Sequence, residues 1–325
     1  MGSPGRALIC GISGQDGSYL ARLLLRQGYE VWGSSRDAES NSFANLRRLE
    51  IFDSVRLISL DLGDSGSILS ALRRIRPSEV FSVAGQTSVG LSFDQPLETI
   101  ESIAVGALNL LEAIRLSDLD VRLYSAGSSE IFGDTGSCRV QESSPLVPRS
   151  PYAVAKASAF WIVNNYREAY GIFACTGILS NHESPLRPYR FVTRKIIGGV
   201  AQILRGNKVV LRLGNLNVER DWGWAPEYVE AIALMLKQPA PRDFIIATGE
   251  THLLSEFVDA AFSLNGLDWH EHVLFDEALA RPTELTRSRL DPAAARETLG
   301  WRARFAMKDV VAMMLDAELK YLGQG

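Results

Sequence analysis

The chain has 325 residues, of which 46% are hydrophobic and 22% are charged, and its formal net charge is −4. This composition is typical of a globular protein and excludes a mainly disordered, collagen-like or coiled-coil architecture. The slightly acidic charge does not indicate a partner that is nucleic acid. Apolar runs stay below the roughly 18 residues that a membrane span requires, so no membrane partner is expected.

The three cysteines, Cys10, Cys138 and Cys175, are odd in number and widely spaced. This pattern does not predict a disulfide framework, and it favours reduced thiols in the cytoplasm. The four histidines lack any spacing typical of a metal centre, so no metal is expected.

Short β-rich runs alternate with longer helical patterns through the first half of the chain. Strands are predicted at residues 7–10, 29–33, 55–62, 79–84, 121–126 and 173–179. Helices are predicted at residues 18–27, 67–75, 97–116 and 151–170. This alternation predicts parallel βαβ units and therefore an α/β fold with a doubly wound parallel sheet.

A glycine-rich turn follows the first predicted strand. Its sequence, GISGQDG, places Gly11, Gly14 and Gly17 in the spacing GxxGxxG, with Gln15 and Asp16 between the last two. The first glycine allows a tight turn, the second lets a pyrophosphate approach the backbone, and the third lets the helix pack on the strand. The strand before the turn and the helix after it favour a dinucleotide site over a turn without a ligand.

The end of the second predicted strand indicates which dinucleotide binds. Here Arg36 follows two serines and precedes Asp37. An arginine accommodates the 2′-phosphate of NADP, whereas an acidic residue holds the ribose hydroxyls of NAD, so NADP is favoured and NAD stays open. Asp61 and Leu62, at the end of the third strand, are placed to contact the adenine, although a turn role for Asp61 fits the pattern equally well.

The predicted helix at residues 151–170 begins with Tyr152 and Lys156, in the spacing YxxxK. Four residues apart on a helix means one face, where the ammonium should favour the phenolate and lower the tyrosine pKa. Ser128 follows the preceding strand, at the edge of the sheet where ligands bind, and it can meet a substrate oxygen or cap a turn. Because YxxxK is common by chance, its position after this strand carries the prediction that Tyr152 is a base.

The second half of the chain is less regular. Helices are predicted at residues 191–205, 226–237, 255–264 and 307–321. We expect residues 1–178 to form a Rossmann-like NADP-binding domain, joined by returning strands near residues 209–215 and 244–247. Residues 179–325 are expected to form mainly a smaller substrate-binding lobe.

The glycine turn, the Ser/Tyr/Lys set and the chain length together resemble the extended short-chain dehydrogenase/reductases. Within that class the sequence resembles the GDP-mannose 4,6-dehydratase family over nearly its whole length. The stretches that carry the resemblance are GISGQDGSYL (11–20), SPYAVAKA (150–157), NHESP (181–185), FVTRK (191–195), LGNLNVERDWG (213–223), ATGETH (247–252) and RPTE (281–284). GQDG, NHESP and RDWG together are far more selective than the glycine spacing alone.

The resemblance implies a lyase that works by internal redox with NADP. Tyr152 would take the proton of the sugar 4-hydroxyl as hydride leaves carbon 4, and Lys156 would also anchor the nicotinamide ribose. Glu130 matches the carboxylate that removes the proton on carbon 5 and helps expel the 6-hydroxyl as water. Ser128 stands beside the 4-oxygen, where the family usually has threonine.

The resemblance also implies a GDP-linked sugar as substrate. Its contacts are expected at Asn181, Lys195, Arg220, Arg281 and Glu284, with Glu284 toward the guanosine. Cationic side chains suit a diphosphate, and a carboxylate accepts hydrogen bonds from guanine or ribose. The residues alone leave two alternatives open. Arg220 could form a local salt bridge with Asp221, and Arg281 could be a solvated charge of a loop.

The chain departs from the family pattern at several positions. Asp37 stands where the family often has a second arginine that commonly serves a tetramer contact, so we expect a homodimer, with a homotetramer as the alternative. Ser88, in the expected substrate region, replaces a bulkier His or Phe, which suggests a larger sugar such as a GDP-linked manno-heptose. Residues 188–190 also differ from the family.

Two other functions stay open. One is a reductase or epimerase that acts on GDP-4-keto-6-deoxy sugars, and it would consume NADPH where a dehydratase recycles its cofactor. The other is a non-catalytic homologue that binds NADP and a GDP-sugar. The complete set of Ser128, Glu130, Tyr152 and Lys156 argues against the second.

Overall fold

The computed structural model describes residues 5–279 and 281–323 of the chain. Its centre is a seven-stranded sheet in the order β11-β6-β5-β4-β1-β2-β3, in which every neighbouring pair is parallel. The strands are β1 (Arg6–Cys10), β2 (Glu30–Ser35), β3 (Arg56–Ser59), β4 (Glu79–Ser82), β5 (Arg122–Ala126), β6 (Ala174–Leu179) and β11 (Phe244–Ile246). The prediction of a doubly wound parallel sheet is confirmed, and so is the return of the strand near residues 244–247.

The direction of winding changes beside β1. The chain runs outward from β1 through β2 to β3, crosses back to β4, and then continues through β5 and β6 on the other side. The loops after β1 and β4 therefore diverge, and ligands of such sheets bind at this point, beyond the carboxyl ends of the strands. The glycine turn follows β1 and thus lies at this point.

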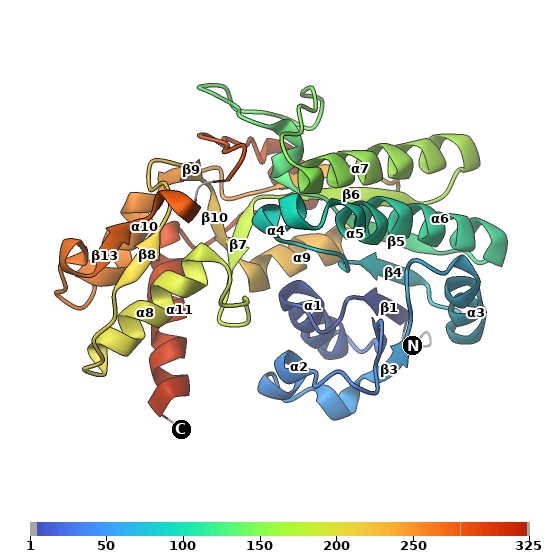
Figure 1. Ribbon diagram of the computed structural model, residues 1–325. Coiled ribbons are helices and arrows are strands. Elements are labelled where there is room, and N and C mark those ends of the chain that lie inside the picture. Colours follow the sequence, from blue (N-terminus) through green and yellow to red (C-terminus); the bar gives the residue numbers. More distant parts are fainter. Residues whose placement is uncertain (1–4, 280, 324–325) are drawn as a thin grey trace.

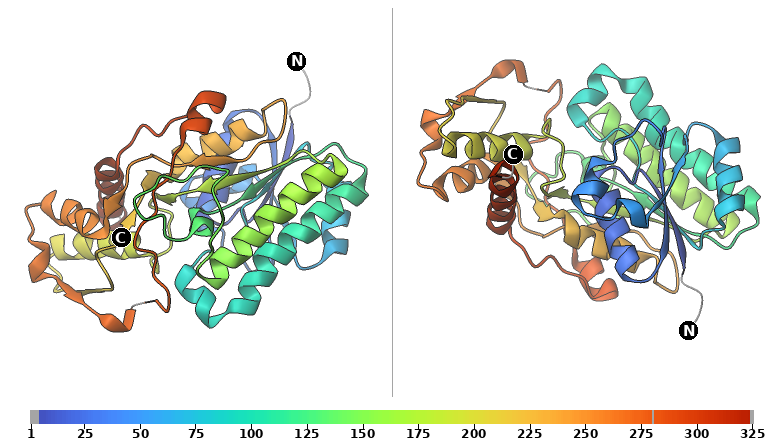
Figure 2. Two further views of the ribbon diagram at one scale, coloured as in Figure 1. Left: turned by 90° about the horizontal axis from the view of Figure 1, so that it is seen from above. Right: turned by 90° about the horizontal axis from the view of Figure 1, so that it is seen from below.

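Helices cover both faces of the sheet (Figure 2). Alternate residues of β1 serve the two faces: Ala7 and Ile9 belong to one apolar core, and Leu8 and Cys10 belong to another. The first core is completed by α1 (Gln15–Arg26) and α9 (Ala225–Met235), and the second by α3 (Ser65–Ile75), α6 (Gly106–Ser117) and α7 (Pro151–Tyr170). Burial on both faces explains why these strands are near-continuous apolar runs.

The helix predicted at residues 97–116 is continuous but not uniform. It consists of α5 (Pro96–Ile100), a π-helical turn at Glu101–Val105, and α6. Such a turn inserts a residue into the helix and re-aims the side chains on either side of it.

A smaller lobe lies beside the carboxyl edge of the sheet (Figure 1). It is built from the helices α8 (Val192–Leu204), α10 (Leu254–Ser263) and α11 (Met307–Gly323), with β8 (Leu211–Leu213) and β13 (Val273–Phe275). The prediction that the strand near residues 209–215 joins the main sheet is wrong, because β8 pairs with β13 instead. Its Leu211 packs onto α8 at Gly199, where a Cβ atom would lie 2.6 Å from the leucine, so this strand belongs to the core of the lobe.

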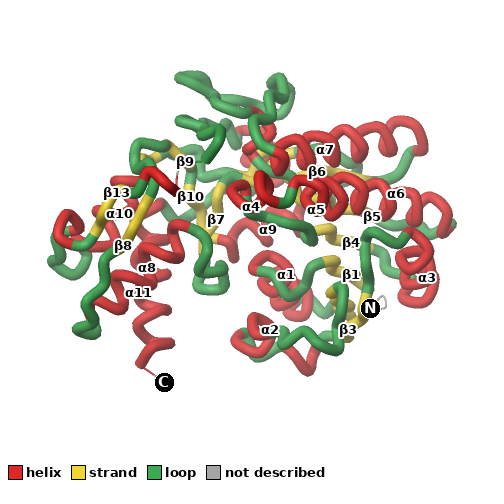
Figure 3. Tube along the Cα trace, in the orientation of Figure 1, coloured by secondary structure: helices red, strands yellow, loops and turns green. Residues whose placement is uncertain are grey.

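Two short two-stranded sheets lie between the main sheet and the lobe. β7 (Asn181–Glu183) pairs with β10 (Trp222–Trp224), and β9 (Glu219–Arg220) pairs with β12 (His252–Leu253). Long loops also cross this region (Figure 3). The remaining short elements are α2 (Ala44–Arg48), α4 (Val89–Asp94) and the turns at Phe52–Ser54, Ser129–Phe132, Trp269–Glu271, Glu277–Leu279 and Ala295–Leu299. Among the described residues, no helix has the length and apolar character that crossing a bilayer demands.

Candidate active site

The glycine turn has the geometry of an anion cradle. Gly11 has a φ of +89°, and a Cβ atom there would lie 2.7 Å from the Ala84 backbone. A Cβ on Gly17 would lie 2.4 Å from the carbonyl oxygen of Gly11, so helix α1 can approach β1 only without a side chain at this position. Gly14, by contrast, is exposed and would meet only that same oxygen at 3.4 Å. The turn therefore leaves an open backbone at the N-terminus of α1, which suits a pyrophosphate.

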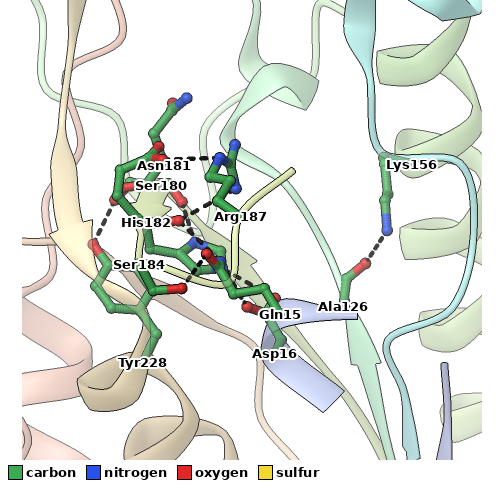
Figure 4. A network of polar contacts seen from close by, with 11 residues as sticks. Gln15, Asp16, Ala126, Lys156, Ser180, Asn181, His182, Ser184, Arg187 and Tyr228 are labelled. Atoms are coloured by element: carbon green, nitrogen blue, oxygen red, sulfur yellow. Dashed lines mark hydrogen bonds and ion pairs between the residues drawn. The ribbon is translucent and has the colours of Figure 1, made fainter. Parts of the chain in front are cut away.

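The side chains of Gln15 and Asp16 turn away from this cradle and bind the segment that follows β6 (Figure 4). Gln15 donates to the carbonyl oxygen of His182 at 3.1 Å and accepts from the hydroxyl of Ser184 at 2.7 Å. His182 Nε2 lies 3.0 Å from both carboxylate oxygens of Asp16, and Nδ1 lies 2.8 Å from the carbonyl oxygen of Ser180. The GQDG and NHESP stretches thus interlock. Because these side chains are engaged with His182 and Ser184, only the backbone atoms of Gln15 and Asp16 stay available for the predicted contacts with a cofactor.

Asp16 and His182 form a buried ion pair. Burial alone would raise the pKa of Asp16, but the charge and hydrogen bond of His182 lower it to about 2. Burial likewise acts to lower the pKa of His182, and the charge of Asp16 outweighs it and raises that pKa. With acceptors at both ring nitrogens, the His182 ring is placed to carry a second proton, and its contacts tie the glycine turn to β7.

The residues after β2 and β3 are exposed. Arg36 lies 3.4 Å from Glu98 of α5, while the Asp37 carboxylate accepts hydrogen bonds from the backbone amides of Glu39 and Ser40. Asp61 is exposed and accepts from the amide of Gly63 at 2.9 Å, as a turn residue does. Leu62, next to it, is buried.

Tyr152 and Lys156 lie in the first turns of α7, which begins as predicted at Pro151 with Ser150 as its N-cap. Both side chains are buried, as is Ser128, whose hydroxyl caps the turn at Ser129–Phe132. Lys156 Nζ donates to the carbonyl oxygen of Ala126, at the end of β5, over 2.6 Å. The ammonium lies 5.9 Å from the centre of the Tyr152 ring and thus over its face.

The expectation that Lys156 lowers the pKa of Tyr152 is wrong for this arrangement. Burial raises the pKa of Tyr152 to about 12, against a smaller opposite effect of a hydrogen bond with Ser128. Burial also lowers the pKa of Lys156 to about 8, because removal from water disfavours the ammonium. Desolvation is therefore the largest effect on both groups, and Tyr152 is a neutral phenol at pH 7.

Glu130 lies within electrostatic reach of two site residues from different parts of the fold. Its negative charge is one cause that raises the pKa of Tyr152, after burial and the Ser128 contact. The same charge acts against the lowering of the Arg220 pKa by burial. The carboxylate is thus close enough to influence both the phenol on α7 and the guanidinium on β9.

Three of the predicted substrate residues form one cluster in the lobe. Arg220 is buried, and its Nη2 lies 4.0 Å from Glu284, which also lies 3.7 Å from Arg281. Arg281, whose side chain is 36% exposed, is partly solvated, whereas the alternative of a salt bridge between Arg220 and Asp221 does not hold. Asp221 instead binds Ser180 and two backbone amides on another loop.

The other predicted substrate residues lie on separate elements, β7, α8 and the N-terminus of α4. Asn181 begins β7 and pairs with Trp222. Lys195, on α8, donates to the carbonyl oxygen of Arg212 at 2.6 Å. The hydroxyl of Ser88 accepts from the amide of Leu91 and caps α4.

Arg187 is a charged residue of this region that the sequence patterns did not single out. Its Nε lies 2.9 Å from Glu183, and its positive charge lowers the pKa of Tyr152 and Asp16 after the larger effects of their nearer neighbours. It follows the NHESP stretch by two residues, and that proximity was the available signal.

Comparisons with known proteins agree with the resemblance. A family model described as GDP-mannose 4,6 dehydratase matches residues 8–314. GDP-mannose 4,6 dehydratase 1 from Arabidopsis thaliana is 44% identical over 324 residues, which cover 97% of this chain and 90% of that protein. The GDP-mannose 4,6 dehydratase from Homo sapiens is 40% identical over 348 residues, which cover 99% of this chain and 94% of that protein.

Solved structures share the fold. UDP-glucose 4-epimerase from Thermus thermophilus, in complex with NAD, superposes with a TM-score of 0.84 at 28% identity, covering 96% of this chain and 98% of that one. dTDP-glucose 4,6-dehydratase from Streptomyces venezuelae, with NAD bound, has a TM-score of 0.87 at 24% identity and covers 98% of each chain. With the family match and relatives that align over almost their full length, the chain belongs to the GDP-mannose 4,6-dehydratase family.

Proposed function

We propose that this protein is a GDP-sugar 4,6-dehydratase, a lyase that converts GDP-mannose or a related GDP-manno-sugar to the 4-keto-6-deoxy sugar. The observation that carries the proposal is the position of Glu130, whose charge acts on both Tyr152 and Arg220. A simple reductase needs a phenol and a lysine, but elimination of water needs an additional carboxylate beside them.

The residues around the glycine turn fit a nicotinamide dinucleotide, and we propose NADP. The open backbone at Gly14 and the N-terminus of α1 would hold the pyrophosphate. Arg36 would meet the 2′-phosphate, since Asp37 is engaged with its own loop. Lys156 would contact the nicotinamide ribose. When bound, the nicotinamide accepts a hydride from carbon 4 of the sugar and returns it to carbon 6.

The chain's own groups would carry the protons. Tyr152 takes the proton of the 4-hydroxyl, and Ser128 hydrogen-bonds the same oxygen. Because burial raises the pKa of Tyr152 to about 12, the phenolate requires nearby positive charge. Among the described residues, Lys156, one turn away on α7, and Arg187 are cations that lie near it.

Glu130 would perform the elimination. Oxidation at carbon 4 makes the proton on carbon 5 acidic, and the carboxylate can remove it. The same proton can then be delivered to the departing 6-hydroxyl, which leaves as water. One carboxylate serves both steps because it is restored to its starting state at the end.

The direct test is incubation of the purified protein with GDP-mannose and a trace of NADP, followed by mass spectrometry of the nucleotide sugar. A dehydratase lowers the product mass by one water and turns over without added NADPH. Stoichiometric consumption of NADPH would indicate a reductase. Binding of GDP-mannose without any conversion would indicate a non-catalytic homologue.

The Glu130→Gln variant separates the two halves of the reaction. Its oxidation step should persist, so reduced nicotinamide should accumulate on the enzyme and be visible by absorbance, while the overall kcat falls roughly 10²- to 10⁴-fold. Glu168→Gln, at an exposed position of the same helix as Tyr152, is the matched control and should keep full activity. Normal turnover by Glu130→Gln would contradict the role of this carboxylate.

The sugar is a finer part of the proposal. Ser88 caps α4 with its own short side chain, and a bulkier residue here would extend further. We propose that the site admits GDP-manno-heptose as well as GDP-mannose. Measurement of kcat/KM for the two sugars tests this: no turnover of GDP-manno-heptose would contradict the proposal, and equal or better use of GDP-mannose would exclude a heptose specialist.

We further propose a homodimer formed through the surface of α5, α6 and α7. These helices expose large apolar side chains, among them Leu97 (77% exposed) and Trp161 (60% exposed). A dimer in light scattering that dissociates in Trp161→Arg supports this surface, and a tetramer would support the alternative assembly. The expected setting is the cytoplasm, since the three cysteines are free thiols.

A further inference from the structure

Asp221, the residue after Arg220, is a buried carboxylate with an unusual set of partners. It is 1% exposed. Its Oδ1 accepts from the Ser180 hydroxyl at 2.9 Å and from the Thr248 amide at 3.1 Å, and its Oδ2 accepts from the Gly249 amide at 2.8 Å. Across the described ranges, 5–279 and 281–323, it takes part in no ion pair.

These contacts join four segments of the chain at one point. Ser180 follows β6, Thr248 and Gly249 lie after β11, and Asp221 itself lies between β9 and β10. The hydroxyl of Tyr228, on α9, lies 2.6 Å from that of Ser180 and completes the group (Figure 4). A single carboxylate therefore holds the end of the main sheet, the following loop and the strand that carries Arg220.

The guanidinium of Arg220 has few contacts of its own, and its backbone pairs with His252 of β12. Its Nη1 donates to the carbonyl oxygen of Glu219 at 2.9 Å, and its ion pair with Glu284 is long, at 4.0 Å. The guanidinium is nevertheless buried, so its position depends on the backbone that carries it. In an extended chain neighbouring side chains point in opposite directions, and Asp221 thus anchors this backbone from the side away from Arg220.

We propose that Asp221 is a positioning residue that holds Arg220 where it meets the diphosphate of the nucleotide sugar. This inference rests on the proposed function, in which Arg220 binds that diphosphate. Asp221 itself touches neither substrate nor cofactor. Its loss should weaken binding of the nucleotide sugar and leave both cofactor binding and the chemical steps nearly unchanged.

The Asp221→Asn variant tests this with minimal change in shape. An amide can replace only one of the two accepting oxygens, and its NH₂ group would face a backbone N–H donor. We expect the KM for GDP-mannose and the Kd for GDP to rise about tenfold, the size of effect that loss of a hydrogen bond to a charged group produces. The kcat should stay within about twofold, and the Kd for NADP should not change.

Asp243→Asn is the matched control for a loss of stability. Asp243, whose side chain is 10% exposed, also accepts from a backbone amide, that of Thr176 at 2.6 Å, and it pairs with Arg167 at 2.7 Å. This variant should lower the melting temperature and leave the KM for GDP-mannose unchanged. If Asp221→Asn does not fold, Ser180→Ala decides, because it removes one donor to the carboxylate and should raise the same KM about threefold.

The outcomes are distinct. Wild-type protein that neither binds GDP nor converts GDP-mannose would overturn the proposed function, and this inference with it. Wild-type protein that does both, with an unchanged KM in Asp221→Asn, or in Ser180→Ala if the first variant does not fold, would overturn the inference alone. An equal loss of affinity for GDP and NADP would also overturn it, since that would indicate a general structural role.

Discussion

Tyr152 and Lys156, at the carboxyl edge of the main sheet, have few polar partners, whereas Arg220 and Arg281 of the lobe lie beside Glu284. On the sheet side desolvation dominates, and it moves the pKa of Tyr152 up to about 12 and that of Lys156 down to about 8. On the lobe side burial lowers the pKa of Arg220 as well, but the negative charges of Glu130 and Glu284 act against this effect. The difference indicates that the sheet side is suited to moving protons, and the lobe side to holding a fixed anion.

The largest expected effect comes from removing the phenol on the sheet side. Tyr152→Phe should lower kcat about 10³-fold, because no other group at that position can take the 4-hydroxyl proton. The dissociation constants for NADP and GDP, measured by calorimetry, should stay within about threefold of the wild-type values. Tyr166→Phe removes a hydroxyl from the same helix, bonded to Glu112 at 2.7 Å, and should be fully active. A comparable loss in both variants would point to damage of α7 as a whole.

On the lobe side, the expected loss is in binding. Arg220→Ala should raise the KM for GDP-mannose roughly 30- to 100-fold, since a charge-assisted contact with the diphosphate disappears. Its kcat at saturation should change far less. Arg287→Ala, which removes a more exposed partner of Glu219, is the control and should bind normally. A change in kcat larger than the change in KM would contradict the assignment of binding to the lobe side and of proton transfer to the sheet side.

A smaller effect is expected at the cofactor end. Arg36→Ala should reduce the preference for NADP over NAD about tenfold, because the 2′-phosphate loses its cation. The comparison is the ratio of the two dissociation constants. Arg26→Ala, at the exposed end of α1, is the control and should not change that ratio. An unchanged ratio in Arg36→Ala would instead favour NAD as the natural cofactor.

The smallest effect concerns pH and the ion pair that joins the two sides. The pKa of His182 is raised, so its contribution to stability is complete below its ordinary value of 6.5 and is lost as pH rises through the higher folded value. The pKa of Asp16 is lowered from 3.8 to about 2, so its contribution is complete above 3.8 and is lost as pH falls toward 2. The pair stabilises most between these limits.

Thermal and chemical unfolding of the wild type and of Asp16→Asn, over a range of pH, would measure the contribution of the Asp16–His182 pair to stability. The difference in the free energy of unfolding between them should be largest near pH 5 and should shrink as pH rises through the folded pKa of His182. Glu168→Gln supplies the baseline for an exposed carboxylate. A difference that does not vary with pH would mean that His182 is neutral.

Local sequence patterns predicted much of the sheet half. The helix from Pro151 to Tyr170 has the predicted bounds, because a proline at its first turn and a glycine after its end mark both limits. The glycine turn was predictable for a similar reason, since the positive φ of Gly11 and the close approach of Gly17 to the carbonyl oxygen of Gly11 are backbone requirements within a few residues. The resemblance then identified Glu130 and Arg220, which pattern alone would have left as an ordinary carboxylate and cation.

The lobe was predicted less well. A three-residue apolar run such as Leu211–Leu213 does not specify its partner strand, and the space left by Gly199 on α8 assigned it to the core of the lobe. The roles of Gln15 and Asp16 also depended on distant residues, since Gln15 meets His182 across 167 positions of sequence. The role of Asp221 could not be predicted from local patterns either, because its partners Ser180 and Thr248 are distant in the sequence.

The sequence by itself determined the α/β class, the main run of strands and helices and the glycine turn, and it supplied the candidate acid, base and cationic side chains. Those features depend on backbone constraints and apolar periodicity within short segments. Only the tertiary structure decided which charges meet, where β8 packs, and that Tyr152 is a neutral phenol while Lys156 has a pKa of about 8. Desolvation and ion pairing depend on everything packed around a group, and that surrounding comes from all parts of the chain.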